Sequence, residues 1–214
     1  MDVVLDNLPA FLRATGVTAE LTVLSFAMAM VIGTLVAGLR VSPVPPLRWL
    51  GTVYVEIVRN TPLLLLMYLF FFGFTKIGIR YSTFTSAIIV LSAYTGTFVA
   101  ETVRAGINTV APGQAEAARA LGLGFLQLLF LVVLPQAFRS VVAPLGSVFI
   151  ALIKNSAIAF TIGATDLSFE SNQLSNSTGR PVAVLLGAGF FYLLLALPSG
   201  WAVGWLERRL AVRR

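Results

Sequence analysis

The stretch VTAELTVLSFAMAMVIGTLVAGL occupies residues 17–39 and contains a single charged residue, Glu20. A helix that crosses the hydrocarbon core of a membrane needs about 20 mainly apolar residues. This stretch therefore predicts a membrane-spanning helix with Glu20 near its outer end. Pro43, Pro45 and Pro46 follow it, and so many prolines end a helix and indicate a turn.

Four further apolar stretches predict four further spans. The five expected spans cover about residues 17–39, 57–75, 82–103, 137–162 and 182–206. The segment between the third and fourth spans, about residues 104–130, is too charged to cross the membrane. The polar segment 166–180 is rich in Ser and Asn and is expected to form an external loop with room for a short helix. The sequence thus predicts an all-α integral membrane protein whose 214 residues form one domain.

The composition excludes several classes of function. Of the 214 residues 57% are hydrophobic and 11% are charged, whereas a soluble domain carries roughly 25% charged residues. The chain has no Cys and no His, which removes disulfides, zinc sites and His-based acid–base catalysis. Its two lysines, Lys76 and Lys154, follow Thr75 and Ile153 rather than Gly, so the phosphate-binding P-loop is absent. We therefore expect no metal, no cofactor and no ATP site in this chain.

The basic residues predict the orientation of the chain in the membrane. The net charge is +6, but the basic residues are scattered between apolar runs, which argues against a nucleic-acid partner. One set of loops and span ends carries ten arginines, and the opposite set carries four basic residues. Because cytoplasmic loops are enriched in Lys and Arg, we expect the N-terminus outside and the C-terminus in the cytoplasm.

The segment APGQAEAARALG, residues 111–122, carries the clearest signal for function. Pro112 suits the first turn of a helix, and Glu116 lies in the early turns, where the helix dipole favours an anion. Four alanines keep the expected helix slim, and Gly122 can end it in a left-handed conformation. A short exposed helix of this kind suits a groove on a partner protein. From composition alone, a solvated connecting loop is the alternative interpretation.

The spacing of these residues resembles a known signature. Glu116-Ala117-Ala118, then Gly122, then Leu134-Pro135 is similar to the EAA motif of ABC importer permeases, with Val132 where Ile is usual. Further segments look like the polar amino-acid permease family of the histidine, glutamine and glutamate type. These segments are Gly16-Val17-Thr18, Tyr54-Val55-Glu56, Arg59-Asn60-Thr61-Pro62, Glu101-Thr102-Val103-Arg104-Ala105-Gly106, Pro112-Gly113-Gln114, Leu134-Pro135-Gln136-Ala137 and Leu206-Glu207-Arg208-Arg209-Leu210. The resemblance covers nearly the whole chain, although Asn60 stands where Gly is common. The bias for Arg over Lys looks closest to actinobacterial glutamate permeases.

The resemblance implies a type I ABC importer permease fold in the bacterial plasma (inner) membrane, surrounded by lipid. It also implies three kinds of protein partner: ABC ATPase subunits that bind ATP and Mg²⁺, a second permease chain (a paralogue or a second copy), and an extracellular or periplasmic amino-acid-binding protein. The segment 104–130, here called the coupling loop, would contact the ATPase. The residues expected to transmit this contact are Glu116, Ala117, Ala118, Arg119, Ala120, Gly122, Leu134 and Pro135. In this scheme Leu134-Pro135 redirects the chain into the fourth span.

Four residues are candidates for the substrate path: Lys154, Asn155, Ser156 and Glu101. Ionisable groups inside a span usually line a cavity or pair with a partner. Lys154 is 15 residues beyond Arg139, about 22 Å along a helix, and so lies beyond the midplane of the membrane. An ammonium group there would attract carboxylates, so we expect an anionic or neutral amino acid as substrate, with glutamate favoured. Alternatively, Glu101 or an acid of the second permease chain neutralises Lys154. Glu101 also precedes Arg104 by three residues, which favours a local ion pair.

Two other classes of function remain open at this point. A secondary transporter or channel subunit driven by an ion gradient would also consist of apolar spans, but it would need no ATPase chain. A membrane-embedded enzyme would need catalytic acids or His residues clustered within the spans, and only Glu101 and Lys154 approach that. Five spans are few for a solitary transporter, which favours assembly with a second permease chain.

Overall fold

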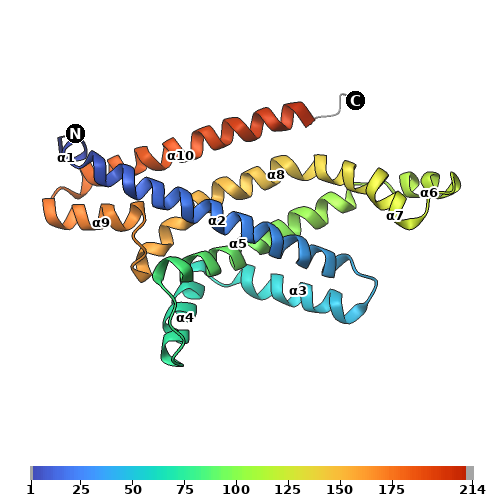
Figure 1. Ribbon diagram of the computed structural model, residues 1–214, viewed down its shortest axis with the longest axis horizontal. Helices are drawn as coiled ribbons and strands as arrows, with labels where there is room; N and C mark the ends of the chain where they lie inside the picture. The colour runs from blue at the N-terminus through green and yellow to red at the C-terminus, as the bar shows by residue number, and fades with distance from the viewer. Residues whose placement is uncertain (1, 211–214) are drawn as a thin grey trace.

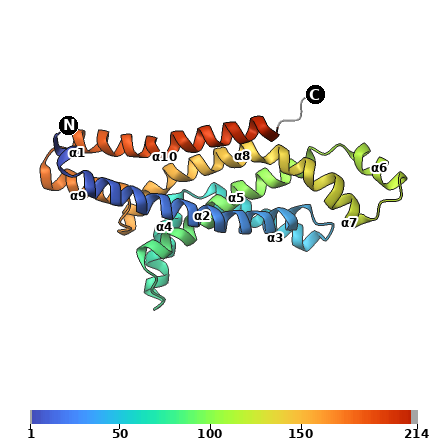
Figure 2. The same cartoon turned by 45° about the horizontal axis from the view of Figure 1, so that its top comes forward.

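The computed structural model describes residues 2–210, most of which lie in helices. In chain order the helical elements are α1 (Asp2–Asp6), α2 (Leu8–Val41), α3 (Pro45–Asn60), α4 (Leu63–Lys76), α5 (Thr83–Asn108), α6 (Pro112–Ala120), α7 (Phe125–Leu128), the π-helical turn η1 (Leu129–Val133), α8 (Leu134–Asn155), the 3₁₀ helix η2 (Ser156–Ile162), α9 (Leu167–Thr178) and α10 (Pro181–Leu210). The long helices run along the longest axis of the molecule, whereas α4 stands across it (Figure 1). The N-terminus and α9 lie at one end, and α6 extends beyond the other helices at the opposite end (Figure 2).

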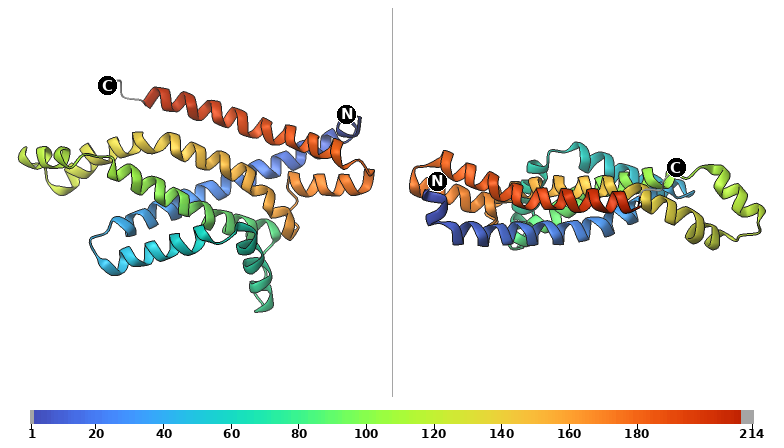
Figure 3. Two further views of the ribbon diagram at one scale, coloured as in Figure 1. Left: turned by 180° about the vertical axis from the view of Figure 1, so that it is seen from behind. Right: turned by 90° about the horizontal axis from the view of Figure 1, so that it is seen from above.

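Among the described residues, four helical segments are long and apolar enough to cross a membrane. They are Leu8–Val41, Thr83–Asn108, Leu131–Ile162 and Pro181–Arg209. The expected spans 17–39 and 82–103 lie within the first two. The observed segment that contains the expected span 137–162 begins six residues before it, at Leu131. The expected span 182–206 lies within the last segment. Views from behind and from above show the same alignment of these segments along one axis (Figure 3).

The span expected at residues 57–75 needs correction, because the structure has no continuous helix there. Helix α3 ends at Asn60 and α4 begins at Leu63, and the two are bent by 102°. Pro62 accounts for the break, since proline disfavours helical backbone in the residue before it. Thr61 accordingly has extended backbone angles, φ −93° and ψ 132°. The segment expected to form the second span is therefore a bent pair of helices, α3 and α4.

Close packing of α2 against α5 forms the centre of the fold. A Cβ added at Gly33 would overlap the side chain of Val99 and the carbonyl oxygen of Gly96. Gly96 in turn faces Ile32, and Ala29 one turn before Gly33 is fully buried. Small residues at such positions let two membrane helices approach closely. This contact fixes how the charged residues of α2 and α5 lie relative to one another.

Helix α8 is held between α5 and α10 by two further glycines. A Cβ at Gly106 of α5 would overlap Val141 of α8, and a Cβ at Gly146 of α8 would overlap Val203 of α10. Leu152, near the end of α8, is fully buried in a cluster with residues of α2 and α5. Helix α8 is therefore fixed to the helical body along its length, and so is whatever is attached to its N-terminal end.

Helix α9 occupies most of the segment that was expected to be an external loop. The carboxylate of Asp166 caps it by accepting the backbone N–H of Phe169 at 2.9 Å. The next residue, Leu167, donates its N–H to Thr18 Oγ1 of α2 at 3.0 Å. Asp166 is completely buried, and this burial raises the pKa of its carboxyl to about 6, even though the N–H of Phe169 acts in the opposite direction. The cap and the Thr18 contact fix α9 to the body.

Candidate functional site

The coupling loop contains a short helix, α6, that projects from the helical body (Figure 1). It starts as expected, with Pro112 in its first turn behind an extended Ala111. The side chains of Glu116 and Arg119 are exposed, and so are the alanines that follow them, Ala117 and Ala120. Ala118 is buried. Among the described residues, neither Glu116 nor Arg119 forms an ion pair. The helix therefore presents both charges and two small residues to its surroundings.

A left-handed turn at Gly122 ends this helix, as the sequence predicts. Gly122 has φ +81° and donates its N–H to the carbonyl of Arg119 at 2.9 Å. Leu123 then donates to the carbonyl of Ala118 at 3.1 Å. This pair of hydrogen bonds is the Schellman arrangement of a helix C-terminus. The turn directs the chain into α7.

No break in the helix accompanies Leu134-Pro135, where the sequence predicts a change of direction. Helices α7, η1 and α8 follow one another without a break, and Pro135 lies in the first turn of α8. Pro135 has no N–H to donate to the carbonyl four residues before it. A π-helical turn lets that carbonyl accept from the residue five places on, which explains how the chain stays helical here. The coupling loop is thus joined to α8 through a helix.

The substrate-path candidates Lys154, Asn155 and Ser156 lie at the junction of α8 and η2. Ser156 is completely buried, and its hydroxyl donates to the carbonyl of Ile153 at 2.8 Å. Asn155 lines a cavity of about 230 Å³ between α5 and α8. Lys154 is exposed, and it forms no ion pair within residues 2–210. The three consecutive residues therefore have three different environments.

The cavity beside Asn155 adds residues that the sequence analysis did not identify. Thr95 and Phe98 of α5 line it, together with Ser147 and Ala151 of α8. Ser147 and Ala151 precede Asn155 by eight and four residues, so the three share one face of a helix. Helical spacing before Asn155 is the signal that identifies Ser147 and Ala151. Thr95, Ser147 and Asn155 contribute a few polar atoms to this cavity, whose lining is otherwise apolar.

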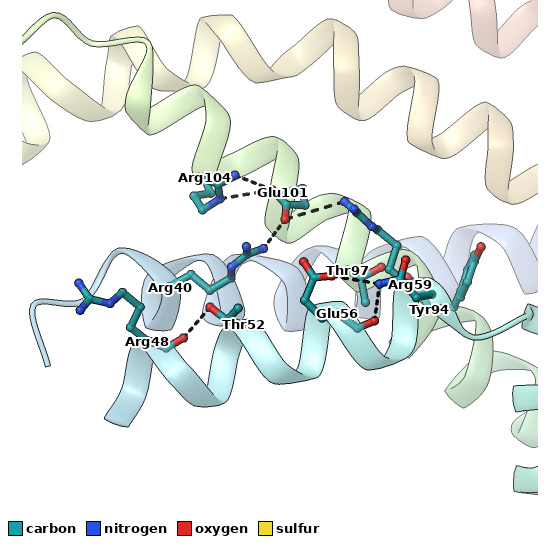
Figure 4. Close-up of polar contacts among 10 residues, drawn as sticks. Arg40, Arg48, Thr52, Glu56, Arg59, Tyr94, Thr97, Glu101 and Arg104 are labelled. Carbon is teal, nitrogen blue, oxygen red and sulfur yellow. Dashed lines mark hydrogen bonds and ion pairs between the residues drawn. The ribbon is translucent and has the colours of Figure 1, made fainter. Parts of the chain in front are cut away.

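Glu101 lies in the C-terminal third of α5 and pairs with arginines instead of Lys154, so the expectation that Glu101 neutralises Lys154 is wrong, whereas an acid of the second permease chain stays a prediction. The Oε2 of Glu101 accepts from Arg104 Nη2 at 2.8 Å, which confirms the expected local ion pair. Its Oε1 accepts from Arg40 Nη1 at 2.5 Å and lies 3.9 Å from Arg59 Nη1. We call Glu101, Arg40, Arg59 and Arg104 the Glu101 cluster; Figure 4 shows how the arginines surround the carboxylate.

The Glu101 cluster joins three helices, because Arg40 comes from α2 and Arg59 from α3. The sequence analysis counted these two arginines for the orientation of the chain and not as members of a site. Both lie in the last turn of their helices, but no local pattern indicates that they meet Glu101. Three guanidinium groups against one carboxylate leave the cluster with a net charge of +2.

The described residues contain no group of three or more acidic side chains that could hold a metal ion. Charge, hydrogen bonding and exposed surface are the properties that the sites above present, and these suit recognition of a ligand or a partner.

Comparison with known proteins places this arrangement in a family. A family model described as "binding-protein-dependent transport system inner membrane component" matches residues 29–212. A glutamate transport system permease protein of Corynebacterium glutamicum is 42% identical over 219 residues, covering 96% of each chain. A probable glutamine ABC transporter permease protein of Bacillus subtilis is 38% identical over 210 residues, covering 98% of this chain and 97% of that protein.

Solved structures share the fold. A chain of an amino acid ABC transporter crystallised with histidines superimposes with a TM-score of 0.91, at 31% identity, and the match covers 96% of both chains. A chain of an inward-facing methionine ABC transporter superimposes with a TM-score of 0.82 over 97% of this chain and 99% of that one. Its 22% identity limits that second likeness to the fold.

Proposed function

Because the chain belongs to the family of inner membrane components of binding-protein-dependent transport systems, it is the permease subunit of an ABC amino-acid importer, and we propose that glutamate is its preferred substrate. It is a multi-pass inner-membrane protein with the type I ABC importer permease fold. It has no ATP site of its own, and the ATPase is a separate chain. This membership excludes a transporter driven by an ion gradient.

The observation that carries the glutamate proposal is the 42% identity to the C. glutamicum glutamate permease. Other similar proteins are named for glutamine, cystine and arginine, so family membership alone does not select the substrate. Lys154 supports glutamate through its charge. It is exposed, has no acidic partner among the described residues, and directly precedes Asn155, which lines the cavity between α5 and α8. An ammonium group in this position attracts a carboxylate and repels a cationic side chain.

We further propose that α6 docks in a groove on the ATPase. ATP and Mg²⁺ bind to that ATPase subunit. Glu116 and Arg119 would make the polar contacts, and the exposed Ala117 and Ala120 would allow close approach. The continuous helix from α7 to α8 supports this role, because a displacement of α6 is transmitted to a helix held along its length. A second permease chain and an external amino-acid-binding protein complete the assembly.

The binding protein would dock at the end of the molecule that holds the N-terminus and α9, which we place outside the membrane. The ten-to-four division of basic residues supports this orientation. A reporter enzyme fused after Arg214 tests it, because activity is expected only on the cytoplasmic side. Activity on the outer side would reverse the assignment.

Uptake by the reconstituted importer tests the substrate proposal. Wild-type proteoliposomes that contain the ATPase and the binding protein are expected to import glutamate in preference to arginine. Lys154→Ala should slow glutamate uptake while the affinity of the binding protein for glutamate stays unchanged. Lys154→Arg is the control, since it keeps the positive charge at the same exposed position. Equally efficient import of arginine by the wild type would contradict the proposal.

A further inference from the structure

The Glu101 cluster has more positive charge than a structural ion pair needs. Glu101 uses both carboxylate oxygens on Arg40 and Arg104. The third arginine, Arg59, lies 3.9 Å from the carboxylate and makes no hydrogen bond among the described residues. A guanidinium group has five N–H donors in a planar fork that matches a carboxylate. All five donors of Arg59 are therefore available to another group.

The unused donors lie on the open side of the cluster. The side chain of Arg40 is 10% exposed and that of Glu101 is 23% exposed. The side chains of Arg104 and Arg59 are 35% and 39% exposed. Arg40 thus forms the closed side of the cluster, and Arg59 and Arg104 border its open side (Figure 4).

The open side of the cluster is poorly suited to lipid. Glu101 is 18 residues from the start of α5 at Thr83, which is roughly 27 Å along a helix, so the cluster lies in the last third of a helix that is long enough to span. Charged groups at such a depth line a water-filled cavity, pair with another chain or extend toward the membrane surface. Glu56, also exposed, lies three residues before Arg59 on the same face of α3, and its Oε2 accepts from Asn60 Nδ2 at 3.0 Å. A carboxylate and a guanidinium group therefore lie side by side on α3.

We propose that Arg59 and Arg104, positioned by Glu101, form an inner binding site for the carboxylate of a zwitterionic α-amino acid, with Glu56 receiving its ammonium group. We call it the inner carboxylate site. The proposal rests on the proposed function, since it places the site on the cytoplasmic half of the substrate path, nearer the cytoplasm than Lys154. Arginine binds carboxylates through paired hydrogen bonds, and Arg59 can move to a ligand without breaking either hydrogen bond of Glu101.

Charge-selective labelling of a single cysteine tests the site, because the chain has no native Cys. Val58→Cys places a thiol next to Arg59 at a half-buried position and leaves the hydrogen bond from Asn60 to Glu56 intact. In the importer purified with its ATPase, this thiol is treated with two methanethiosulfonate reagents, one bearing a sulfonate and one bearing a trimethylammonium group. The sulfonate reagent is expected to react about tenfold faster than the trimethylammonium reagent. L-Glutamate should slow the labelling at a concentration where sodium chloride of equal ionic strength does not.

Two variants in the Val58→Cys background make the test specific. Arg59→Gln should bring the rate ratio of the two reagents close to one, and it leaves both hydrogen bonds of Glu101 in place, so the fold is retained. Arg48→Gln removes an arginine of the same helix that points away from Glu101 (Figure 4) and should leave the ratio unchanged. Complete labelling after denaturation and an unchanged gel-filtration profile confirm an intact sample.

The possible outcomes test the inner carboxylate site separately from the preference for glutamate. Absence of labelling, a ratio that Arg59→Gln does not alter, or no protection by either glutamate or glutamine would overturn the inner carboxylate site. Protection by glutamine but not by glutamate would keep the site and overturn the preference for glutamate.

Discussion

Two segments of the chain contain Glu and Arg three residues apart on a helix, and the structure uses them in opposite ways. In α5, Glu101 and Arg104 form a hydrogen-bonded ion pair that also includes Arg40. In α6, Glu116 and Arg119 are exposed and form no ion pair among the described residues. Spacing alone does not determine whether such a pair forms.

The surroundings explain the difference. An exposed ion pair gains little, because water competes for both charges. The charges of α6 are therefore left free for a partner. Within α5 the medium is less polar, and an isolated carboxylate would be costly. There the arginines of neighbouring helices are needed to hold Glu101, and the cluster ties α2, α3 and α5 together.

Neutralising each of the two glutamates gives the largest expected contrast. Glu101→Gln leaves three arginines without their carboxylate and should lower the free energy of unfolding by ~1.5 kcal/mol, since a hydrogen bond to a charged group contributes about 1.5–3 kcal/mol and this cluster is only partly buried. Glu116→Gln, a surface change, should alter it by less than ~0.5 kcal/mol. Thermal unfolding of the purified chain, followed by fluorescence-detected gel filtration, measures both. Equal losses would show that the two pairs do not differ as described.

Reversing the charge of the exposed glutamate should instead affect function. Glu116→Lys is expected to lower substrate-stimulated ATP hydrolysis of the assembled importer more than tenfold, because it disturbs both the helix dipole and the contact with the ATPase. Yield and membrane insertion should match the wild type. The control is Gln114→Lys, an exposed position two residues earlier. Full stimulation by the Glu116→Lys variant with the ATPase still bound would remove the coupling role from α6.

Asp166 is a third acid, buried without any arginine, and its pH dependence sharpens the comparison. Burial raises its pKa from 3.8 to about 6, so the folded chain binds the proton more tightly than the unfolded chain. This contribution to stability is present below the unfolded pKa and is lost as the pH rises through about 6. At pH 5, one unit below the folded pKa, the folded state should be about 1.4 kcal/mol more stable than at pH 7.5 from this group alone.

Melting temperatures of the wild type and Asp166→Asn at the two pH values check this expectation. Asparagine keeps an oxygen that can cap α9 but does not titrate, so the variant should show a smaller difference between pH 5 and pH 7.5. The phenol of Tyr192, which donates to Asp166 at 3.3 Å, is present in both proteins. An identical pH dependence in the two proteins would contradict the role assigned to Asp166.

Features set by local sequence could be predicted, and features set by helix packing could not. The apolar runs, the start of α6 at Pro112, the turn at Gly122 and the Glu101–Arg104 pair all depend on residues within a few positions of one another. The hydrogen bond from Arg40 to Glu101 joins residues 61 positions apart. It depends on how closely α2 approaches α5, which Gly33 and Gly96 determine.

The bent helix pair α3 and α4 could be predicted from the sequence in part. Pro62 and its effect on Thr61 are visible in the sequence, but the 102° bend is not. Helix α4 is apolar on every side, and Leu64, Leu65, Tyr68, Leu69 and Phe72 are all exposed. A helix without a polar face gives no indication of the direction in which it packs. The cavity beside Asn155 is similar: helical spacing indicates Ser147 of α8, but nothing in the sequence indicates that Thr95 of α5 lies opposite.

The smallest expected effect concerns two glycines at the ends of α6. No atom of the described residues lies within 4 Å of a Cβ added at Gly113 or at Gly122, so neither substitution causes a clash. They differ in backbone conformation, since only Gly122 has a positive φ. A β-branched residue in left-handed conformation costs about 1–2 kcal/mol. Gly122→Val should therefore distort the Schellman turn and reduce substrate-stimulated ATP hydrolysis about fivefold, whereas Gly113→Val should reduce it less than twofold.

A third substitution identifies the cause of this difference. Asparagine tolerates the left-handed conformation better than valine, so Gly122→Asn should retain most of the stimulated ATP hydrolysis. The three variants differ little in the surface that α6 offers to the ATPase, because the exposed charges of Glu116 and Arg119 are unchanged. If Gly122→Asn lost as much stimulation as Gly122→Val, the side chain itself would block the ATPase contact and the turn would not matter. The expected order, Gly113→Val near wild type, then Gly122→Asn, then Gly122→Val, would show that the direction of the chain after α6 is part of the coupling.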